Sequence, residues 1–101
     1  MEFVVDPRRW NGAIFVEGTS GCLIGQQLRR AGFVGDCHSS LLVDTIISQG
    51  QYPWLTHALK RDCTASTQFT WFTPAAERWA REMLKKHGHT LRVEYPQKEG
   101  A

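Results

Sequence analysis

The chain has 101 residues, of which 42% are hydrophobic and 22% charged, and its formal net charge is +2. This length predicts one domain at residues 1–96, with a core that removes roughly 60–65% of the unfolded chain's surface from water, followed by a frayed tail at 97–101. The composition excludes a strongly charged protein, so the total charge alone gives no case for binding to nucleic acid or membrane.

The first residues predict two strands. Residues 3–5 (FVV) and 13–17 (AIFVE) are rich in β-formers. The segment DPRRWNG between them contains Asp-Pro and Asn-Gly, which are both turn signals. We therefore expect residues 2–17 to form a β-hairpin with a longer loop.

A helix is expected after the GTSG segment. Ser20 can cap its first turn, Arg29 and Arg30 fall near its end, and Gly32 can stop it. Its apolar residues recur at helical spacing: Ile24, Leu28 and Ala31. Glycines at positions 21 and 25 should each cost this helix roughly 1 kcal/mol.

Two short helices are expected in the middle of the chain. The first covers residues 40–49, with Ser39 or Ser40 as its cap and Gly50 at its end. The stretch 41–47 (LLVDTII) is also rich enough in β-branched residues to be a buried strand, and both readings remain open. The second helix is expected at 53–61, beginning at Pro53.

The last third of the chain predicts a strand–helix–strand unit. Residues 68–72 (QFTWF) have strand composition, and Thr73 and Pro74 mark the start of a helix that ends before Gly88. Leu91, Val93 and Tyr95 then alternate with charged residues, as in a strand with one wet face. The expected fold class is therefore α+β: a small single domain with an N-terminal β-hairpin, central short helices and a C-terminal strand–helix–strand.

The three cysteines do not predict a disulfide framework. Cys22, Cys37 and Cys63 are odd in number, and no pair has CxxC spacing. No signal peptide and no apolar run of membrane-spanning length is visible, so we expect a cytoplasmic protein that is not attached to a membrane. Cys37 and His38 are adjacent, but the histidine and cysteine spacings match no zinc motif. We expect no metal and no cofactor, and we rank a small enzyme with a Cys/His site third among the possible functions.

The segment AIFVEGTSGCLIGQQLRRAGF resembles the P-loop of nucleotide kinases. A strand, Gly18, Gly21 and a helix follow one another as in that family, which implies an anion at the helix N-terminus. The chain has Gly21-Cys22-Leu23 where the family has Gly-Lys-Ser/Thr, so the lysine that reaches the phosphates and the hydroxyl that binds magnesium are missing.

Nucleic-acid binding is the second functional hypothesis. The helices 40–49 and 53–61, followed by a strand and the next helix, are similar to a helix–turn–helix or winged-helix segment over residues 39–87. That resemblance implies DNA contacts by Thr56, His57, Lys60 and Arg61. The basic pairs Arg8–Arg9 and Arg29–Arg30 could add phosphate contacts. The chain departs from the pattern because a wing needs two paired strands.

Protein binding is the first functional hypothesis. Trp10 follows Arg9 in a turn, where a large aromatic side chain is expected to find little core, and Trp and Arg are enriched in interface hot spots. Exposed sheet edges in so small a domain also favour pairing with another chain. We therefore expect a non-catalytic accessory or regulatory module that binds a protein partner or forms a homodimer through Arg9 and Trp10.

Overall fold

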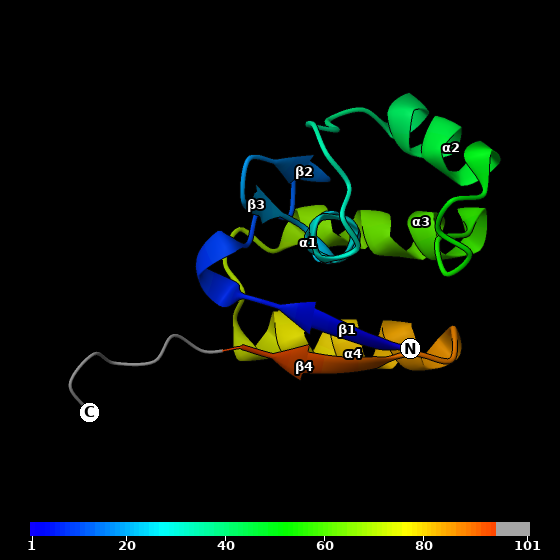
Figure 1. Ribbon diagram of the computed structural model, residues 1–101. Helices are drawn as coiled ribbons and strands as arrows, with labels where there is room; N and C mark the ends of the chain where they lie inside the picture. The colour runs from blue at the N-terminus through cyan, green and yellow to red at the C-terminus, as the bar shows by residue number, and fades with distance from the viewer. Residues whose placement is uncertain (95–101) are drawn as a thin grey trace.

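A computed structural model describes residues 1–94, and it confirms an α+β fold. Four α-helices accompany two separate two-stranded sheets in the described part of the chain. The first sheet lies beside α4 at one side of the molecule, and α1, α2 and α3 lie with the second sheet at the other side (Figure 1). Within residues 1–94, no helix combines the length and apolarity that crossing a membrane demands.

The first sheet joins the two ends of the described chain. β1 (Glu2–Val5) pairs in parallel with β4 (Thr90–Val93), with Phe3 opposite Leu91. The predicted hairpin at residues 2–17 is therefore wrong. The strand ends at the 3-10 turn η1 (Pro7–Arg9), which Asp6 caps. The continuous apolar run after Glu2 is buried on both faces, as is typical of parallel strands.

A much shorter hairpin follows instead. β2 (Val16–Glu17) and β3 (Ser20–Gly21) pair antiparallel across a tight turn. Ser20 consequently belongs to a strand, and the N-cap of the next helix is Cys22. On its other side Val16 exchanges two backbone hydrogen bonds with Cys37, at 3.0 and 2.9 Å.

Helix α1 (Leu23–Arg30) is the centre of the packing. It contacts β1, β2, β3 and α3 (His57–Cys63), and its first six residues are buried. The glycine at position 25 is required by this packing, because a Cβ there would lie 1.2 Å from the backbone oxygen of Phe15. Glycine lowers the helix propensity at this position, but its lack of a side chain allows α1 to lie close to the β2 segment.

Residues 41–47 are helical, which settles the open choice between helix and strand. α2 spans Ser40–Gln49; the Ser39 hydroxyl accepts a hydrogen bond of 3.1 Å from the Leu42 N–H, and Gly50 ends the helix at φ 70°. The next helix, α3, begins later than predicted. The Thr56 hydroxyl accepts from the Leu59 N–H at 3.1 Å, and this cap fixes the start at His57 rather than at Pro53.

The predicted strand at 68–72 is wrong, and so is the strand–helix–strand unit. The 3-10 helix η2 (Thr64–Gln68) continues directly from α3, and the following residues form bends. Their aromatic side chains pack instead of pairing: Phe69 lies against Trp79, and Phe72 against Trp10. Tertiary packing of these rings overrides the strand preference of the local sequence.

Helix α4 (Pro74–Lys86) forms with the predicted cap, because the Thr73 hydroxyl accepts from the Ala76 N–H at 3.2 Å. One stripe of the helix is buried: Ala76, Ala80, Met83 and Leu84. β4 then follows as predicted, with Leu91 buried. Tyr95, which the sequence assigns to this strand, and the predicted tail at 97–101 lie outside the described residues.

Candidate functional site

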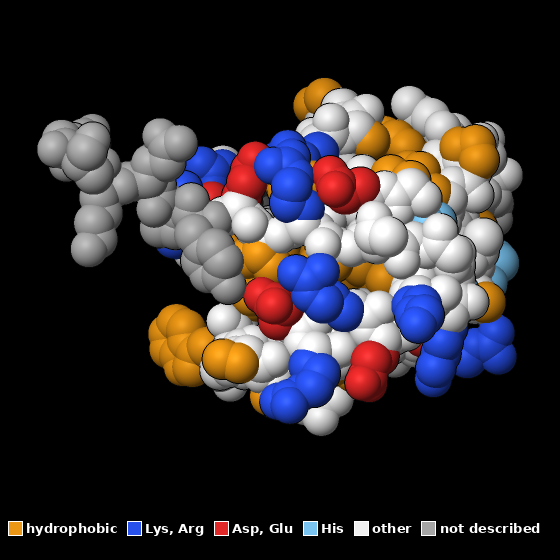
Figure 2. Space-filling model, turned by 90° about the horizontal axis from the view of Figure 1, so that it is seen from below, with side chains coloured by type: hydrophobic (Ala, Val, Ile, Leu, Met, Phe, Trp, Pro, Cys, Tyr) orange, Lys and Arg blue, Asp and Glu red, His pale blue; other side chains and the backbone are white. Residues whose placement is uncertain are grey.

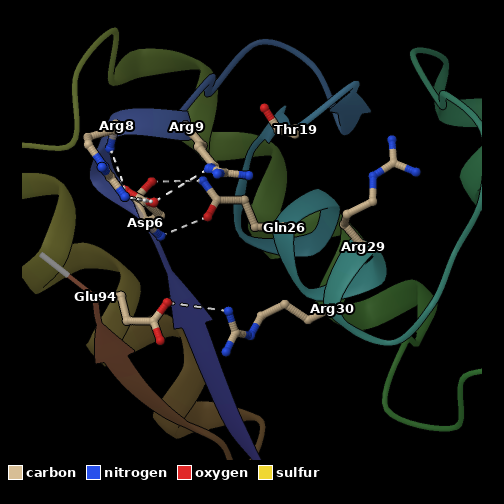
Figure 3. A pocket seen from close by; sticks show the side chains of 8 residues that line it. All are labelled: Asp6, Arg8, Arg9, Thr19, Gln26, Arg29, Arg30 and Glu94. Carbon is tan, nitrogen blue, oxygen red and sulfur yellow. Dashed lines mark hydrogen bonds and ion pairs between the residues drawn. The ribbon is translucent and has the colours of Figure 1, made fainter. Parts of the chain in front are cut away.

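A charged pocket lies between η1 and α1, with a volume of about 310 Å³. Of the described residues, four arginines and two carboxylates line it, together with Thr19 and Gln26. The six charged residues come from three separate parts of the chain, as Figure 3 shows: Asp6, Arg8, Arg9, Arg29, Arg30 and Glu94. Two of the basic pairs noted in the sequence are thereby brought to one cavity.

Gln26 holds the two walls of this pocket together. Its Oε1 accepts a hydrogen bond of 2.8 Å from the Asp6 N–H, and its Nε2 donates to the Asp6 carbonyl at 3.2 Å. The same Nε2 donates to the Gly21 carbonyl at 3.1 Å. This buried amide therefore fixes the backbone at the end of β1 against α1, which places η1 beside the arginines of the helix.

Arg8 is already paired within the pocket. Its Nη2 donates to Asp6 Oδ2 at 2.9 Å and its Nε to Oδ1 at 3.2 Å, which is a bidentate contact. The hydrogen bonds from Arg8 hold the pKa of Asp6 below its ordinary value, and Asp6 in turn raises the pKa of Arg8. Both groups stay ionised at neutral pH, and Arg8 serves mainly to organise Asp6.

Arg29 also has a structural role. Its Nε donates to the Gly18 carbonyl and its Nη1 to the Phe33 carbonyl, each at 2.9 Å. In Figure 3 its guanidinium group points away from Arg8 and Arg9. Arg29 therefore ties down the β2–β3 turn and the end of α1, and contributes to the pocket chiefly through its charge.

Arg9 and Arg30 are the arginines best placed to receive a ligand. Among residues 1–94, each has one long ion pair: Arg9 Nε with Asp6 Oδ2 at 3.5 Å, and Arg30 Nη1 with Glu94 Oε2 at 3.4 Å. Their side chains are 51% and 44% exposed. Since a guanidinium group has five N–H donors, each retains donors for an anion, and its planar fork matches a phosphate or carboxylate group.

Most residues of the expected recognition helix are occupied by contacts between α2 and α3. Lys60 Nζ lies 2.7 Å from Asp44 Oδ1 and its side chain is only 13% exposed, while His57 Nδ1 lies 3.4 Å from the same oxygen. Thr56 is the N-cap. Arg61 is exposed, but it does not line the arginine pocket.

The face formed by α4 and β4 does not offer a field of one sign either. Lys and Arg side chains are mixed with Asp and Glu over most of this face, with a group of Lys and Arg together at one edge (Figure 2). Arg92 lies between Glu2, at 3.2 Å, and Glu94, at 3.4 Å. An extended surface of positive charge attracts nucleic acid, whereas a surface on which positive charges are paired with negative ones attracts it only weakly.

Trp10 and Arg9, which the sequence assigns together to a protein interface, have different environments. Arg9 is exposed in the pocket, but Trp10 is 8% exposed and belongs to the core. The expectation that this indole finds little core is wrong. The Trp10 side chain contacts Phe72 and the backbone of residue 69, which the bends after η2 bring close to it.

The Cys37–His38 pair is not arranged as a nucleophile and a base. Cys37 is buried, with its Sγ 3.9 Å from the Ser39 carbonyl, and burial raises the pKa of its thiol. His38 is exposed and lies 4.0 Å from Glu17. Among residues 1–94, no three side chains of metal-binding type converge on a common point.

Sequence reasoning identified both arginine pairs but missed their partners in the pocket. Asp6, Gln26 and Glu94 carry no local signal of a site, because Asp6 meets Gln26 only where β1 packs on α1, and Glu94 reaches the pocket only through the pairing of β4 with β1. The available signal was the all-apolar run at residues 3–5, which is typical of a strand buried on both faces. Comparison with protein-family models, with curated proteins and with solved structures finds no match for this chain.

Proposed function

We propose that the protein is a small non-catalytic binding protein that takes the phosphate groups of a nucleic-acid strand in its arginine pocket. The observation that supports this proposal is the pair Arg9 and Arg30, which reach one cavity from different elements with guanidinium donors to spare. Charge-assisted, bidentate hydrogen bonds to phosphate are the strongest contacts these groups can make.

The carboxylates in the pocket limit the expected affinity. Asp6 and Glu94 already share the arginines, so an incoming phosphate must compete with two ion pairs. With about two phosphates neutralised, the logarithm of the binding constant for a single strand should fall with the logarithm of salt concentration with a slope of about −1.4. We expect weak, sequence-independent binding that disappears as salt rises.

The chain offers a matched pair of variants for testing the pocket. Arg30 and Arg92 both form ion pairs of 3.4 Å with Glu94, and both are about half exposed, but only Arg30 lines the cavity. Arg30→Ala and Arg92→Ala therefore remove the same charge from the same partner. Fluorescence anisotropy of a labelled single-stranded oligonucleotide, at low and moderate salt, is the measurement.

Arg30→Ala should weaken binding about tenfold, which corresponds to 1.4 kcal/mol, and should reduce the salt slope by about 0.7. Arg92→Ala should bind like the wild type. Equal losses in the two variants would contradict a pocket and indicate only a general effect of charge. If a free mononucleotide displaces the oligonucleotide at equal phosphate concentration, the ligand is a small phosphate compound rather than a strand.

Self-association is the second candidate function, and a specific feature of the sheet favours it. In the described residues, β4 has a hydrogen-bonded strand on one side only, which is β1. A two-fold axis beside β4 would pair it antiparallel with its copy and create a four-stranded sheet. Arg81 Nη1 donates to the Leu91 carbonyl at 2.6 Å and so blocks part of this edge.

Sedimentation velocity over a range of protein concentrations tests this second candidate. A dimer should dissociate on dilution, and Val93→Pro, which removes a strand N–H, should shift it toward monomer. A single monomeric species up to high micromolar concentration would contradict self-association through β4.

A further inference from the structure

Two cysteines that are distant in the sequence meet in the interior. Cys22 precedes α1 and Cys63 is the last residue of α3, two helices that pack together. Both residues are buried, they line the same cavity, and their side chains influence each other electrostatically. This contact depends on the fold alone, because the sequence spacing gives no sign of it.

The two sulfurs are not equivalent. The neighbouring Cys63 side chain is the largest cause that lowers the pKa of Cys22. The N–H groups of Ile24 and Gly25, in the first turn of α1, lower the pKa of Cys22 further, whereas burial raises it. The Cys22 side chain forms no capping hydrogen bond of regular geometry. A helix N-terminus favours a thiolate. The same contact and burial raise the pKa of Cys63.

A cavity gives small molecules access to this pair. Its volume is about 230 Å³, and both cysteines line it together with Phe15, Ser66 and the exposed residues His38 and Ser40. A water molecule occupies roughly 30 Å³ in the liquid, so a small hydroperoxide has ample room. Cys37 does not line this cavity.

We propose that Cys22 and Cys63 form a redox-active dithiol, with Cys22 as the nucleophile toward hydroperoxides and Cys63 as the resolving cysteine. The Cys22 thiolate attacks the peroxide oxygen; an S–O bond forms, the O–O bond breaks, and water or an alcohol leaves after taking up a proton. The Cys63 sulfur then attacks the sulfenic acid; the S–S bond forms, the S–O bond breaks, and the sulfenic hydroxyl group leaves as water with the Cys63 proton. The two thiols supply the two electrons that reduce the peroxide.

Peptide mapping of the wild-type protein tests this proposal. The folded protein is treated with hydrogen peroxide, denatured, alkylated and digested without reductant, and the peptides are analysed by mass spectrometry. We expect loss of alkylation at two of the three cysteines, with one linked peptide that joins Cys22 to Cys63. Full alkylation of all three cysteines, or links that involve Cys37, would overturn the proposal.

Three variants assign the roles. Cys63→Ser should leave the sulfenic acid on Cys22, where dimedone traps it, whereas Cys22→Ser should abolish both the trapped adduct and the linked peptide. Cys37→Ser is the matched control, because it removes a buried thiol outside the cavity and should form the linked peptide as the wild type does. Faster dimedone labelling of Cys37 than of Cys22 in the Cys63→Ser variant would refute Cys22 as the nucleophile. The peptide map of the wild-type protein tests the Cys22–Cys63 link even if a substitution prevents a variant from folding.

Discussion

The indole Nε1 of Trp10 donates a hydrogen bond of 2.9 Å to the backbone carbonyl of Phe69. This bond joins the turn after β1 to the bends before α4, two segments that no sheet or helix connects. The ring of Trp10 also packs on Phe72, with centroids 5.1 Å apart. One side chain thus supplies both an apolar contact and the partner for a main-chain group.

Trp10→Ala should therefore destabilise the protein strongly. Loss of a buried aromatic side chain costs about 3–5 kcal/mol, and the freed Phe69 carbonyl adds to that loss. Chemical denaturation followed by circular dichroism gives the free energy of unfolding. Trp71→Ala is the control, because Trp71 is 75% exposed and its replacement should change stability by no more than about 0.5 kcal/mol. A Trp10→Ala variant as stable as the control would contradict the packing of Trp10 between Phe69 and Phe72.

Gly25→Ala should destabilise the protein although alanine is the better helix former. Helix propensity alone predicts a gain of about 1 kcal/mol. The added Cβ would lie 1.2 Å from the Phe15 oxygen and 2.2 Å from its carbonyl carbon, so α1 must move away from β2. We expect a net loss of more than about 1 kcal/mol in denaturation experiments, from overpacking.

Ser48→Ala provides the control for this substitution, because it raises helix propensity at an exposed position of α2. It should leave stability unchanged or slightly higher. A Gly25→Ala variant more stable than Ser48→Ala would show that α1 and β2 are not in the close contact observed.

The Lys60–Asp44 pair should make the free energy of unfolding fall at acidic pH. The hydrogen bond from Lys60, at 2.7 Å, is the largest cause that holds the pKa of Asp44 below its ordinary value of 3.8. A carboxyl group whose pKa is lower in the folded state stabilises the protein above its unfolded pKa. This contribution is lost as pH falls below 3.8 toward the folded pKa.

Lys60→Met should therefore lower the free energy of unfolding at neutral pH and also flatten its decline in acid. Urea denaturation at a series of pH values from about 6 to 2 measures both effects. Lys85→Met, at an exposed position of α4, should reproduce the wild-type curve. An acid dependence of Lys60→Met as steep as that of the wild type would remove this pair as its cause.

Local signals were sufficient for some elements of this fold. Thr73, Pro74 and Gly88 mark both ends of α4, and each acts within one turn of the backbone, so the sequence shows them directly. The helical identity of residues 41–47 could not be decided in this way, since their β-branched residues suit either structure. In the helix, Val43 and Ile46 lie on one face and pack into the core.

Long-range pairing was beyond local signals. β1 pairs with β4 from the other end of the described chain, and nothing near Phe3 indicates which strand will be its neighbour. The same pairing brings Glu94 to the arginine pocket. The pairs Arg8–Arg9 and Arg29–Arg30 were visible as charges, but their meeting requires the contact of Gln26 with Asp6.

Gln26 offers a test that separates the geometry of the pocket from its charge. Gln26→Met keeps the length of the side chain and the net charge, but it removes hydrogen bonds to the Asp6 N–H and to the carbonyls of Asp6 and Gly21. Each buried backbone group left unpaired costs about 1–3 kcal/mol. Gln51→Met, at an exposed position, is the control for the substitution itself.

The binding experiment then distinguishes two explanations for any affinity toward nucleic acid. If Arg9 and Arg30 act as a pocket, Gln26→Met should weaken oligonucleotide binding under conditions where the variant is still folded, because η1 is no longer held against α1. If only the sum of positive charge matters, the variant should bind like Gln51→Met, since both keep every charged group. Anisotropy at low salt, with circular dichroism of the same samples, decides between them, and unchanged binding by Gln26→Met would reduce the arginine cluster to a charged surface without a defined site.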